Sequence, residues 1–424
     1  MSYRFADCQG FAGGMAVGAT QAGFQLVGKT EKPGGFGLPL MEANRRFLGD
    51  SWQAQIGDPV DWEPVTADVV VGTPPCAAFS GMSVGTAAHG VHSSINNCMR
   101  DLIGYAVKVR PLAVVMESVG QAYSQGITLM RELNETLNAG TGLRYHATHV
   151  LQNNWLLGGA TKRRRYFLVL SRVPFGVEFE PPTRLATVGD AIGDLTDLSL
   201  SWEPQLYQSP PTWWSLGQVS ASTGKVDGHH LPVGGVDYQK RVMDLVTGDR
   251  AVPWPVGDSE EEVLRRYYET NGELPESWHY DGKASRSGLG HLTRDKQLIE
   301  KGFKVGGFSR PRHWPWDEPG RVINGAGPFM VWHPHNRFAT HREVARLMGF
   351  PDDYLIEPCK DVRALGSFWG KGTSVHPARW VMTWLRQSLD GNPGSLIGQE
   401  QADGSRLIDV STVRRPVTEV SLPA

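Results

Sequence analysis

The sequence predicts an α/β protein with a doubly wound sheet and a second, loop-rich domain. Residues 1–172 alternate short apolar runs, bounded by glycine or proline, with longer segments of helical pattern. A glycine-bearing turn follows the first apolar run, as at the start of a doubly wound sheet. From about residue 173 the chain is rich in Pro, Gly, Trp and His and loses sustained periodicity, which indicates a second domain or a large insertion.

The apolar runs and the helical patterns predict the elements in order. Strands are expected at residues 4–7, 24–29, 68–72, 112–116, 148–152 and 166–170. Residues 97–109 carry apolar side chains at helical spacing and predict a connecting helix. THREVARLMGF and ARWVMTWLRQSL predict two later amphipathic helices. Because strands joined by helices pair in parallel, we expect a parallel sheet.

These changes of pattern predict a discontinuous first domain. We expect residues 1–172 to form it, residues 173–331 to form the second domain, residues 332–391 to return to the first, and residues 392–424 to be a peripheral tail.

Composition narrows the class of protein. The chain has 424 residues with 42 Lys and Arg against 44 Asp and Glu, so polyanion binding would need a local basic patch. Its four cysteines are widely spaced, which argues against a disulfide framework or a zinc cluster, and we expect no metal. The start, MSYRFADCQGFAGG, lacks the basic and apolar regions of a signal peptide. We therefore expect a cytoplasmic protein.

The first strand and its turn have the form of a nucleotide-binding site. Glycines stand in the turn at Gly10, Gly13 and Gly14, where backbone amides could meet a cofactor. Glu31 ends the second strand about 20 residues later, where a ribose diol would be bound. Asp58 precedes the next predicted strand, although an isolated Asp is more often a turn residue.

A cysteine with charged neighbours is the candidate for chemistry. Cys76 follows the run ADVVV and two prolines in GTPPCAAFS, and by itself it could equally be an apolar filler. Glu117 ends another apolar run, and Arg163 and Arg165 stand at alternate positions entering another. Alternate residues of a strand share a face, so both arginines can point the same way. Together these residues form a plausible constellation for chemistry on a heterocycle.

The order of these motifs resembles the cytosine-5 DNA methyltransferase family. The glycine turn, Glu31, Asp58, the PPC at Cys76, E-x-V at Glu117 and R-x-R at Arg163 and Arg165 are similar to that family's motifs. NRFATHREVARLMGFPDDY is similar to its late helix, and GKGTSVHP resembles its closing G-N-S-V. The resemblance implies a Rossmann-like methyltransferase sheet, a target-recognition domain at residues 173–331, and a prokaryotic or viral context.

The resemblance also implies roles for the residues. Cys76 would attack carbon 6 of a flipped cytosine, Glu117 would bond ring nitrogen 3, and Arg165 and Arg163 would hold the base or nearby backbone. S-adenosylmethionine would be held by the sites expected for the cofactor: Gln9, Gly10, Phe11, Gly13, Gly14, Glu31, Asp58, Pro75, Thr373 and Ser374.

Double-stranded DNA is the implied partner; a monomer could act on it, and the sequence leaves the oligomeric state open. Residues 283–312 hold eight basic residues against Asp295 and Glu300, although an ordinary solvated surface would have the same composition. DNA contacts are expected from Ser80, Ser83, Lys283, Arg286, Arg294, Arg310 and Arg312.

The departures from the family lie around the cofactor. Gln9 stands where the family has an aromatic, and Phe11 where it has a glycine. Lys371, Gly372, Thr373, Ser374 and Val375 stand at the closing motif. Drift with S-adenosylmethionine retained is one explanation; a pocket rebuilt for another donor, a carboxylated S-adenosylmethionine or a methylene-folate, is the other. A catalytically weak DNA-binding relative and an RNA-directed relative are further alternatives.

Overall fold

The computed structural model places most of the chain. The structure describes residues 2–33, 37–80, 89–195, 242–275, 311–324, 327, 331–333, 337–355 and 369–411. The chain divides into two compact units, of which the first is Met1–Ala186 with Gly372–Ala424 and the second is Thr187–Lys371.

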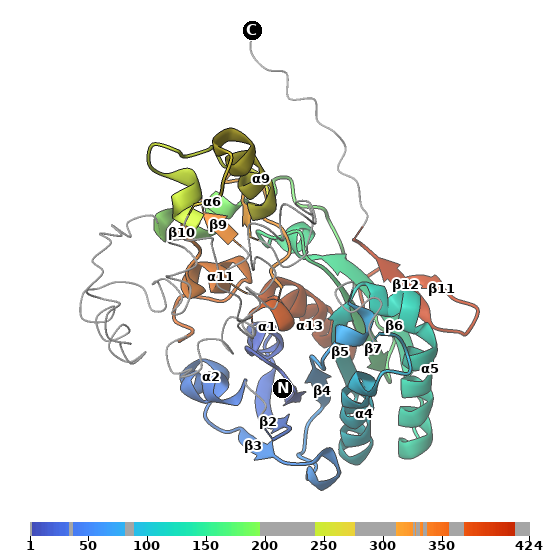
Figure 1. The fold of residues 1–424 in the computed structure, drawn as a ribbon. Helices are drawn as coiled ribbons and strands as arrows, with labels where there is room; N and C mark the ends of the chain where they lie inside the picture. The colour runs from blue at the N-terminus through green and yellow to red at the C-terminus, as the bar shows by residue number, and fades with distance from the viewer. Residues whose placement is uncertain are drawn as a thin grey trace. The chain divides into compact units, whose positions relative to one another are not determined.

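The first unit is built on one large sheet (Figure 1). Among the described residues it has nine strands in the order β11-β12-β6-β7-β5-β4-β1-β2-β3. Their bounds are β1 Arg4–Cys8, β2 Gln25–Glu31, β3 Gln53–Ile56, β4 Val69–Gly72, β5 Ala113–Val119, β6 His146–Asn153, β7 Arg164–Ser171, β11 Gln399–Glu400 and β12 Arg406–Asp409.

All six predicted strands are present, and the sheet is mixed where a parallel one was expected. β7 runs antiparallel to both β5 and β6, and β11 runs antiparallel to β12. β3 was not predicted, because its sequence, QAQI, has little apolar character and it lies at the edge of the sheet. Because β7 is antiparallel to β5, the first residues of β7 lie at the edge of the sheet where β5 ends.

Helices cover the sheet. The predicted helix at residues 97–109 is α4 (Asn97–Val109), which packs with α5 (Gln121–Thr141). Side chains of both helices share one core with Val70 and Val114 of the sheet, and burial of each large apolar side chain contributes about 1.5–3 kcal/mol. The shorter helices are α2 Leu38–Ala43 and α3 Arg45–Leu48, and the single turns are η1 Pro59–Asp61, η2 Ala77–Phe79, η3 Ser94–Asn96 and η4 Asn154–Leu157.

Two helices distant in sequence pack closely together. α1 (Gly14–Gln21) contacts α13 (Val375–Leu389), which is the second predicted late helix. A Cβ on Gly18 would lie 2.6 Å from the Cβ of Ala378, so only glycine allows this approach. This packing fixes α13, which follows the second unit in the sequence, beside α1, which follows the glycine turn.

The C-terminal segment extends the sheet, which differs from the peripheral tail expected for residues 392–424. β12 pairs in parallel with β6, with Arg406 opposite Thr148, and β11 pairs with β12. Ile408 and Val410 of this segment are buried. The short strands lack a long apolar run, which explains why their pattern was not recognised. Residues 412–424 lie outside the described part of the chain.

The second unit is smaller and less regular. Its described elements are α6 Val188–Ile192, η5 Gly193–Leu195, α9 Glu260–Asn271, β8 Arg312–His313, β9 Val331–His333, β10 Arg337–Phe338 and α11 His341–Leu347. A small core includes Trp254, Val263, Tyr267 and Phe338. α11 is the helix predicted in THREVARLMGF, and Thr340 and Glu343 form a capping box at its start.

The unit boundaries differ from the expected domain boundaries. Residues 332–371 were expected to belong to the first domain, whereas they form part of the second compact unit. β9 and β10 pair with each other, β9 also pairs with β8, and α11 packs on α6. The chain rejoins the first unit only at Gly372.

Within the described residues, no helix is long and apolar enough to cross a membrane. In the same part of the chain, no group of His, Cys, Asp or Glu side chains could hold a metal ion.

Candidate active site

Cys76 lies just beyond the carboxyl end of the central strand β4. Thr73 and two prolines lead from the strand to Cys76, which begins the single turn η2, and its carbonyl accepts a bond from Phe79 N at 3.0 Å. A Cβ on Gly72 would lie 2.6 Å from the carbonyl oxygen of Cys8 on the neighbouring strand, so the strand end admits only glycine. The Cys76 thiol is free and partly buried.

Glu117 and Arg165 meet beside this cysteine. Glu117 is on β5, next to β4, and is buried. The antiparallel register pairs Val119 with Arg165, so the start of β7 lies at the carboxyl end of β5. Arg165 Nε lies 2.8 Å from Glu117 Oε1, in a nearly fully buried ion pair. The structure therefore brings these two sequence-predicted residues together.

Arg163 holds a different partner. Its side chain is fully buried, and Nη2 donates a hydrogen bond of 2.7 Å to the carbonyl of Gly372. Burial, together with Arg165, lowers the pKa of Arg163, and the opposite charge of Glu117 counters this. Arg163 thus fastens the segment at which the chain returns to the first unit.

The electrostatics of Cys76 and Glu117 are coupled. Burial raises the pKa of Cys76 and Glu117 raises it further, while Arg165, Arg163 and a hydrogen bond from the Val119 amide lower it. Burial also raises the pKa of Glu117, against the lowering effects of both arginines and of Thr373. In the free protein the site therefore favours a neutral thiol beside a carboxyl group that retains its proton more readily than an exposed one.

The closing motif contributes to this same site. Thr373 Oγ1 lies 2.8 Å from the Oγ1 of Thr73, and Thr373 is one of the residues that lower the pKa of Glu117. Ser374 is buried at the N-terminus of α13. Thr373 and Ser374 were expected at the cofactor, and the hydrogen bond that the structure shows for the Thr373 side chain is with Thr73.

The glycine turn between β1 and α1 is tightly constrained. Gln9, Phe11 and Gly13 have positive φ angles of 58°, 47° and 84°. A Cβ on Gly10 would lie 2.0 Å from Asp7 Oδ2, so the turn excludes any larger residue there. Gln9 donates its side-chain amide to the carbonyl of Cys98 at 3.3 Å, which ties the turn to the start of α4. Gly14 begins α1, so its first-turn amides lie beside this turn.

Acidic residues lie at or just after the ends of two neighbouring strands close to this turn. Glu31 ends β2 and lies opposite Ile56 at the end of β3, and the exposed Asp58 follows. Ile56 and Val60, two residues before and after Asp58 in the sequence, expose 61% and 77% of their surface.

A buried lysine lies beneath Glu31. Lys29 Nζ lies 3.0 Å from Glu31 Oε2 and 3.9 Å from Asp7 Oδ2, and the side chains of Lys29 and Asp7 are inaccessible to solvent. Burial raises the pKa of Asp7 to about 6, although Lys29 lowers it. Burial disfavours the charge on Lys29, but the two carboxylates outweigh it and raise the pKa of Lys29. The side chains of Asp7, Lys29 and Glu31 thus form a buried charged cluster next to the glycine turn.

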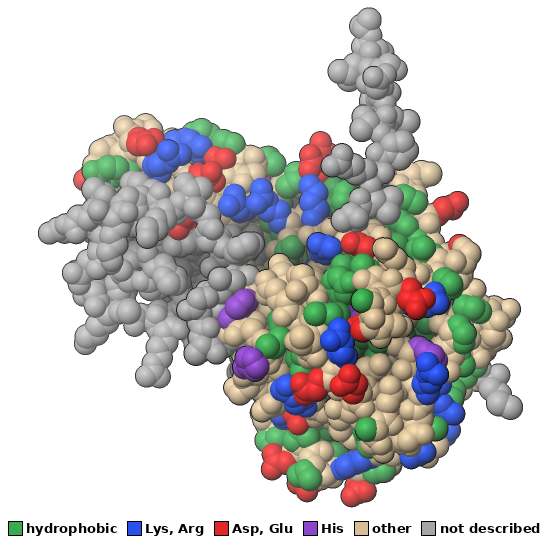
Figure 2. All heavy atoms as spheres, turned by 90° about the vertical axis from the view of Figure 1, so that its right-hand side faces the viewer, with side chains coloured by type: hydrophobic (Ala, Val, Ile, Leu, Met, Phe, Trp, Pro, Cys, Tyr) green, Lys and Arg blue, Asp and Glu red, His purple; other side chains and the backbone are tan. Residues whose placement is uncertain are grey.

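The residues expected to contact DNA are mostly beyond the described part of the chain. Ser83, Lys283, Arg286, Arg294 and Arg310 lie outside the described residues. Ser80 closes the turn after Cys76, where its amide donates to the carbonyl of Ala77. Figure 2 shows basic and acidic side chains interspersed over the described surface of one face, consistent with the near-neutral net charge.

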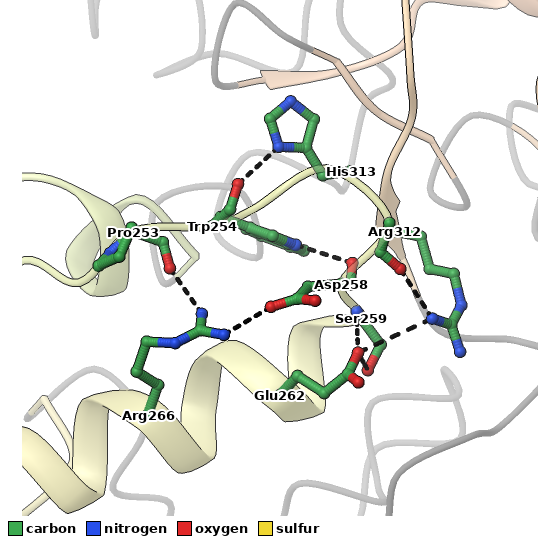
Figure 3. A network of polar contacts seen from close by, with 9 residues as sticks. Pro253, Trp254, Asp258, Ser259, Glu262, Arg266, Arg312 and His313 are labelled. Carbon is green, nitrogen blue, oxygen red and sulfur yellow. Dashed lines mark hydrogen bonds and ion pairs between the residues drawn. The ribbon is translucent and has the colours of Figure 1, made fainter. Parts of the chain in front are cut away.

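Arg312 belongs to a polar network of the second unit (Figure 3). Its Nη1 donates to the carbonyl of Gly257 at 3.0 Å and lies 3.8 Å from Glu262 Oε2. Glu262 also caps α9 through the amide and hydroxyl of Ser259. The Arg312 guanidinium group therefore helps to fix the start of α9.

Sequence reasoning missed three residues of the first unit. Thr73, Lys29 and Asp7 are all buried and take part in the contacts above. For Lys29 a signal was present, because a lysine inside the buried strand FQLVGKTE needs a counter-charge. The adjacent carboxylates in FADC and at Glu31 were the available partners.

Comparison with known proteins gives one consistent result. The C-5 cytosine-specific DNA methylase family matches residues 3–376. The Type II methyltransferase M.XorII of Xanthomonas oryzae pv. oryzae is 27% identical over 444 residues, which cover 97% of this chain and 94% of that protein. A crystal structure described as a DNA modification methyltransferase encoded within an E. coli prophage has 16% identity and a TM-score of 0.54, covering 92% of this chain and all of that one. The last likeness concerns the fold.

Proposed function

The chain belongs to the C-5 cytosine-specific DNA methylase family and is a DNA cytosine methyltransferase, and we propose that Cys76, Glu117 and Arg165 carry its chemistry. The observation that carries this assignment is the meeting of the three residues at the ends of β4, β5 and β7. Glu117 and Arg165 are 2.8 Å apart, and both act on the charge of the Cys76 thiol.

Cys76 is the proposed nucleophile. Carbon 5 of cytosine is a poor nucleophile, and addition of a thiolate to carbon 6 converts the ring into an enamine that can attack an electrophilic methyl group. After methyl transfer, a base or water removes the hydrogen on carbon 5 and the cysteine leaves. Because the thiol is partly buried, the cytosine must leave the DNA stack to reach it, which costs a few kcal/mol.

Glu117 and Arg165 neutralise the charge that develops on the ring. As the thiolate adds, electron density builds at ring nitrogen 3, and a carboxyl group there can supply a proton or a hydrogen bond. The raised pKa of Glu117 favours the protonated form that this role needs. Arg165 is held beside Glu117, where a guanidinium would stabilise the oxygen of the base. Arg163 supports the site through Gly372.

S-adenosylmethionine is the methyl donor that membership of the family implies, and it supplies an electrophilic methyl group when bound. The residues at the glycine turn are compatible with it. Glu31 and the exposed Asp58 offer carboxylates to ribose hydroxyls and an adenine amine, and Ile56 and Val60 offer an apolar surface to an adenine ring. The backbone of Gly10–Gly14 and of the first turn of α1 offers amides to the carboxylate end. Pro75 lies in the segment next to the nucleophile.

Double-stranded DNA is the proposed form of the substrate, with the enzyme acting as a monomer. The second compact unit, Thr187–Lys371, contains the basic cluster of residues 283–312 and is the proposed target-recognition part. Phosphate contacts from the cluster would fix the register, and side chains on its loops would contact base edges.

Covalent capture tests the assignment. Duplex DNA containing 5-fluorocytosine should form a stable adduct with the wild-type protein and S-adenosylmethionine, because fluorine blocks the final elimination. Cys76→Ala should abolish the adduct, while Cys98→Ser, which alters another partly buried thiol, should retain it. An adduct that persists in Cys76→Ala would contradict the assignment.

Nucleoside mass spectrometry of DNA from cells expressing the protein identifies the transferred group. Cys76-dependent 5-methylcytosine is the expected product. A heavier cytosine derivative would instead indicate one of the alternative donors.

A further inference from the structure

A buried lysine holds the acidic residue that ends β2. Lys29 and Glu31 stand two positions apart on this strand, so their side chains share one face of the sheet. Lys29 Nζ donates to Glu31 Oε2 at 3.0 Å and lies 3.9 Å from Oδ2 of Asp7, its register partner on the parallel strand β1. The strand pattern therefore gathers three charged side chains near the carboxyl ends of two parallel strands.

The same ammonium group also contacts the backbone that holds the glycine turn. Lys29 Nζ donates to the carbonyl of Thr30 at 3.3 Å, and that carbonyl accepts the backbone amide of Gln9 at 3.1 Å. Gln9 begins the turn with a φ angle of 58°, which a residue other than glycine adopts only when its surroundings hold it there. Lys29 thus contacts both the Glu31 side chain and the carbonyl group to which the turn is bonded.

Stability alone does not account for a buried ammonium group at this place. The side chains of Lys29 and Asp7 are inaccessible to solvent, and that of Glu31 is 10% exposed. Apolar side chains of similar volume often replace a whole buried ion pair without loss of stability, because they avoid the cost of desolvation. Open α/β sheets bind their ligands at the carboxyl ends of the strands, which is where this cluster lies. The position of the cluster therefore favours a role in ligand binding.

The Glu31 carboxylate keeps the capacity to bind a ligand while Lys29 holds it. The two oxygens of a carboxylate accept about four hydrogen bonds together, and Lys29 uses one of these positions on Oε2. A side chain that is already held in place loses less conformational freedom when a ligand binds. An oriented carboxylate with free acceptor positions is suited to the two adjacent hydroxyl donors of a ribose ring.

We propose that Lys29 is a positioning residue for S-adenosylmethionine, which holds the Glu31 carboxylate in the orientation that accepts the ribose hydroxyls. This inference rests on the proposed role of Glu31 at the cofactor. Lys29 acts through Glu31, and through the carbonyl of Thr30 it also steadies the start of the glycine turn. The expected effect is on affinity for ligands that carry the ribose diol.

The test measures binding in equilibrium dialysis, without turnover. Asp7→Asn combined with Lys29→Met removes the ammonium group and leaves the net charge of the cluster unchanged, because one charge of each sign is lost. This double variant should bind S-adenosylhomocysteine about ten-fold more weakly than wild type, as expected when a hydrogen bond to a charged group is weakened. Lys32→Met is the control and should retain the wild-type affinity, because Lys32 pairs with Asp101.

A second ligand separates orientation of Glu31 from a general loss of structure. The 2′-deoxy analogue of S-adenosylhomocysteine should bind wild type about ten-fold more weakly than S-adenosylhomocysteine does, and this ratio should fall to about three-fold or less in the double variant. Lys29→Gln removes the charge, keeps a polar side chain and should lower the ratio in the same direction. Circular dichroism verifies that each variant is folded. A ratio equal to that of wild type in these folded variants would overturn the proposal.

Glu31→Gln distinguishes failure of this inference from failure of the proposed cofactor site. It should lower the ratio by itself, and adding Asp7→Asn and Lys29→Met to it should weaken binding by less than about two-fold further, because Lys29 acts through Glu31. A full additional loss in the Glu31→Gln background would assign Lys29 a purely structural role. A wild-type ratio in Glu31→Gln would instead show that Glu31 does not bind the ribose, and the proposal for Lys29 would be wrong with it.

Discussion

Lys29→Met removes an ammonium group that contacts both Asp7 and Glu31. Among the described residues, no other ammonium group does so. Lys29 Nζ lies 3.0 Å from Glu31 and 3.9 Å from Asp7, and the side-chain exposures of Lys29, Asp7 and Glu31 are 0%, 0% and 10%. Methionine has a similar length and no charge, so it preserves much of the packing. The two carboxylates would then remain in the interior without their counter-charge.

The distances set the size of the effect. At an effective dielectric constant of about 20, the pair at 3.0 Å attracts by about 5.5 kcal/mol and the pair at 3.9 Å by about 4 kcal/mol. Desolvation of the ammonium group offsets much of this gain, and removal of one partner from a buried pair usually costs about 3–5 kcal/mol. We therefore expect Lys29→Met to lose about 3–5 kcal/mol of unfolding free energy at about pH 8.

The loss should depend on pH in a defined direction. The pKa of Asp7 is about 6 in the folded protein, above its ordinary value of 3.8, so the folded state binds the proton more tightly and ionisation of Asp7 opposes folding as pH rises. Lys29 lowers this pKa, so the cost of ionisation is greater in Lys29→Met. Near pH 5 Asp7 holds its proton in both proteins, and the difference should shrink.

Urea unfolding at about pH 5 and about pH 8 measures both quantities. Lys32→Met is the matched control, because Lys32 pairs with Asp101 at a partly exposed site, with side-chain exposures of 36% and 24%, and such pairs contribute about 0–1 kcal/mol. Asp7→Asn combined with Lys29→Met should recover part of the loss at about pH 8. A Lys29→Met loss below about 1 kcal/mol, or an equal loss at both pH values, would refute the reasoning.

Two other substitutions test local features of the first unit. Gly10→Ala should destabilise the protein by about 1–3 kcal/mol, because its Cβ would lie 2.0 Å from Asp7 Oδ2, whereas Gly104→Ala in α4, with no atom within 4 Å of the new Cβ, should stabilise it by up to about 1 kcal/mol. Urea midpoints compare the two, and equal effects would contradict the clash. Burial lowers the pKa of His149 from 6.5 to about 4, so stability should fall by up to about 3 kcal/mol as pH drops between these values. His149→Gln should flatten this decline in acid unfolding while retaining a polar group for Tyr166, and an unchanged decline would assign the acid sensitivity to other residues.

The fold was predictable where each element has its own local signal. The apolar runs of β1, β2, β4, β5, β6 and β7 and the periodicity of α4 mark these elements without reference to the rest of the chain. The direction of β7 and the pairing of β12 with β6 depend on which strands become neighbours. A four-residue strand such as β12 has too few side chains to specify that partner by pattern.

The candidate site divides in the same way. The motifs of Cys76, Glu117 and Arg165 are recognisable because each lies at one end of an apolar run that predicts a strand. The structure brings Glu117 and Arg165 together. Nothing in the local sequence marks Thr73 or Thr373, because the hydrogen bond between them joins residues that are 300 positions apart. Contacts across so long a loop depend on the completed fold.

The paired pKa shifts explain how a buried site can hold a reactive thiol without carrying an isolated charge. Burial raises the pKa of Cys76 and of Glu117, so ionising either one alone is unfavourable in the free protein. Under the proposed mechanism the thiol loses a proton as sulfur bonds to carbon 6, and ring nitrogen 3 gains a proton. The overall addition leaves the net charge of the site unchanged, and Glu117 lies where it can pass or share the proton. Arg165 then stabilises the charge that is only partly developed during the step. Such a site favours ionisation of Cys76 when a cytosine is bound and can take up the charge. The population of the thiolate in the free enzyme is thereby limited.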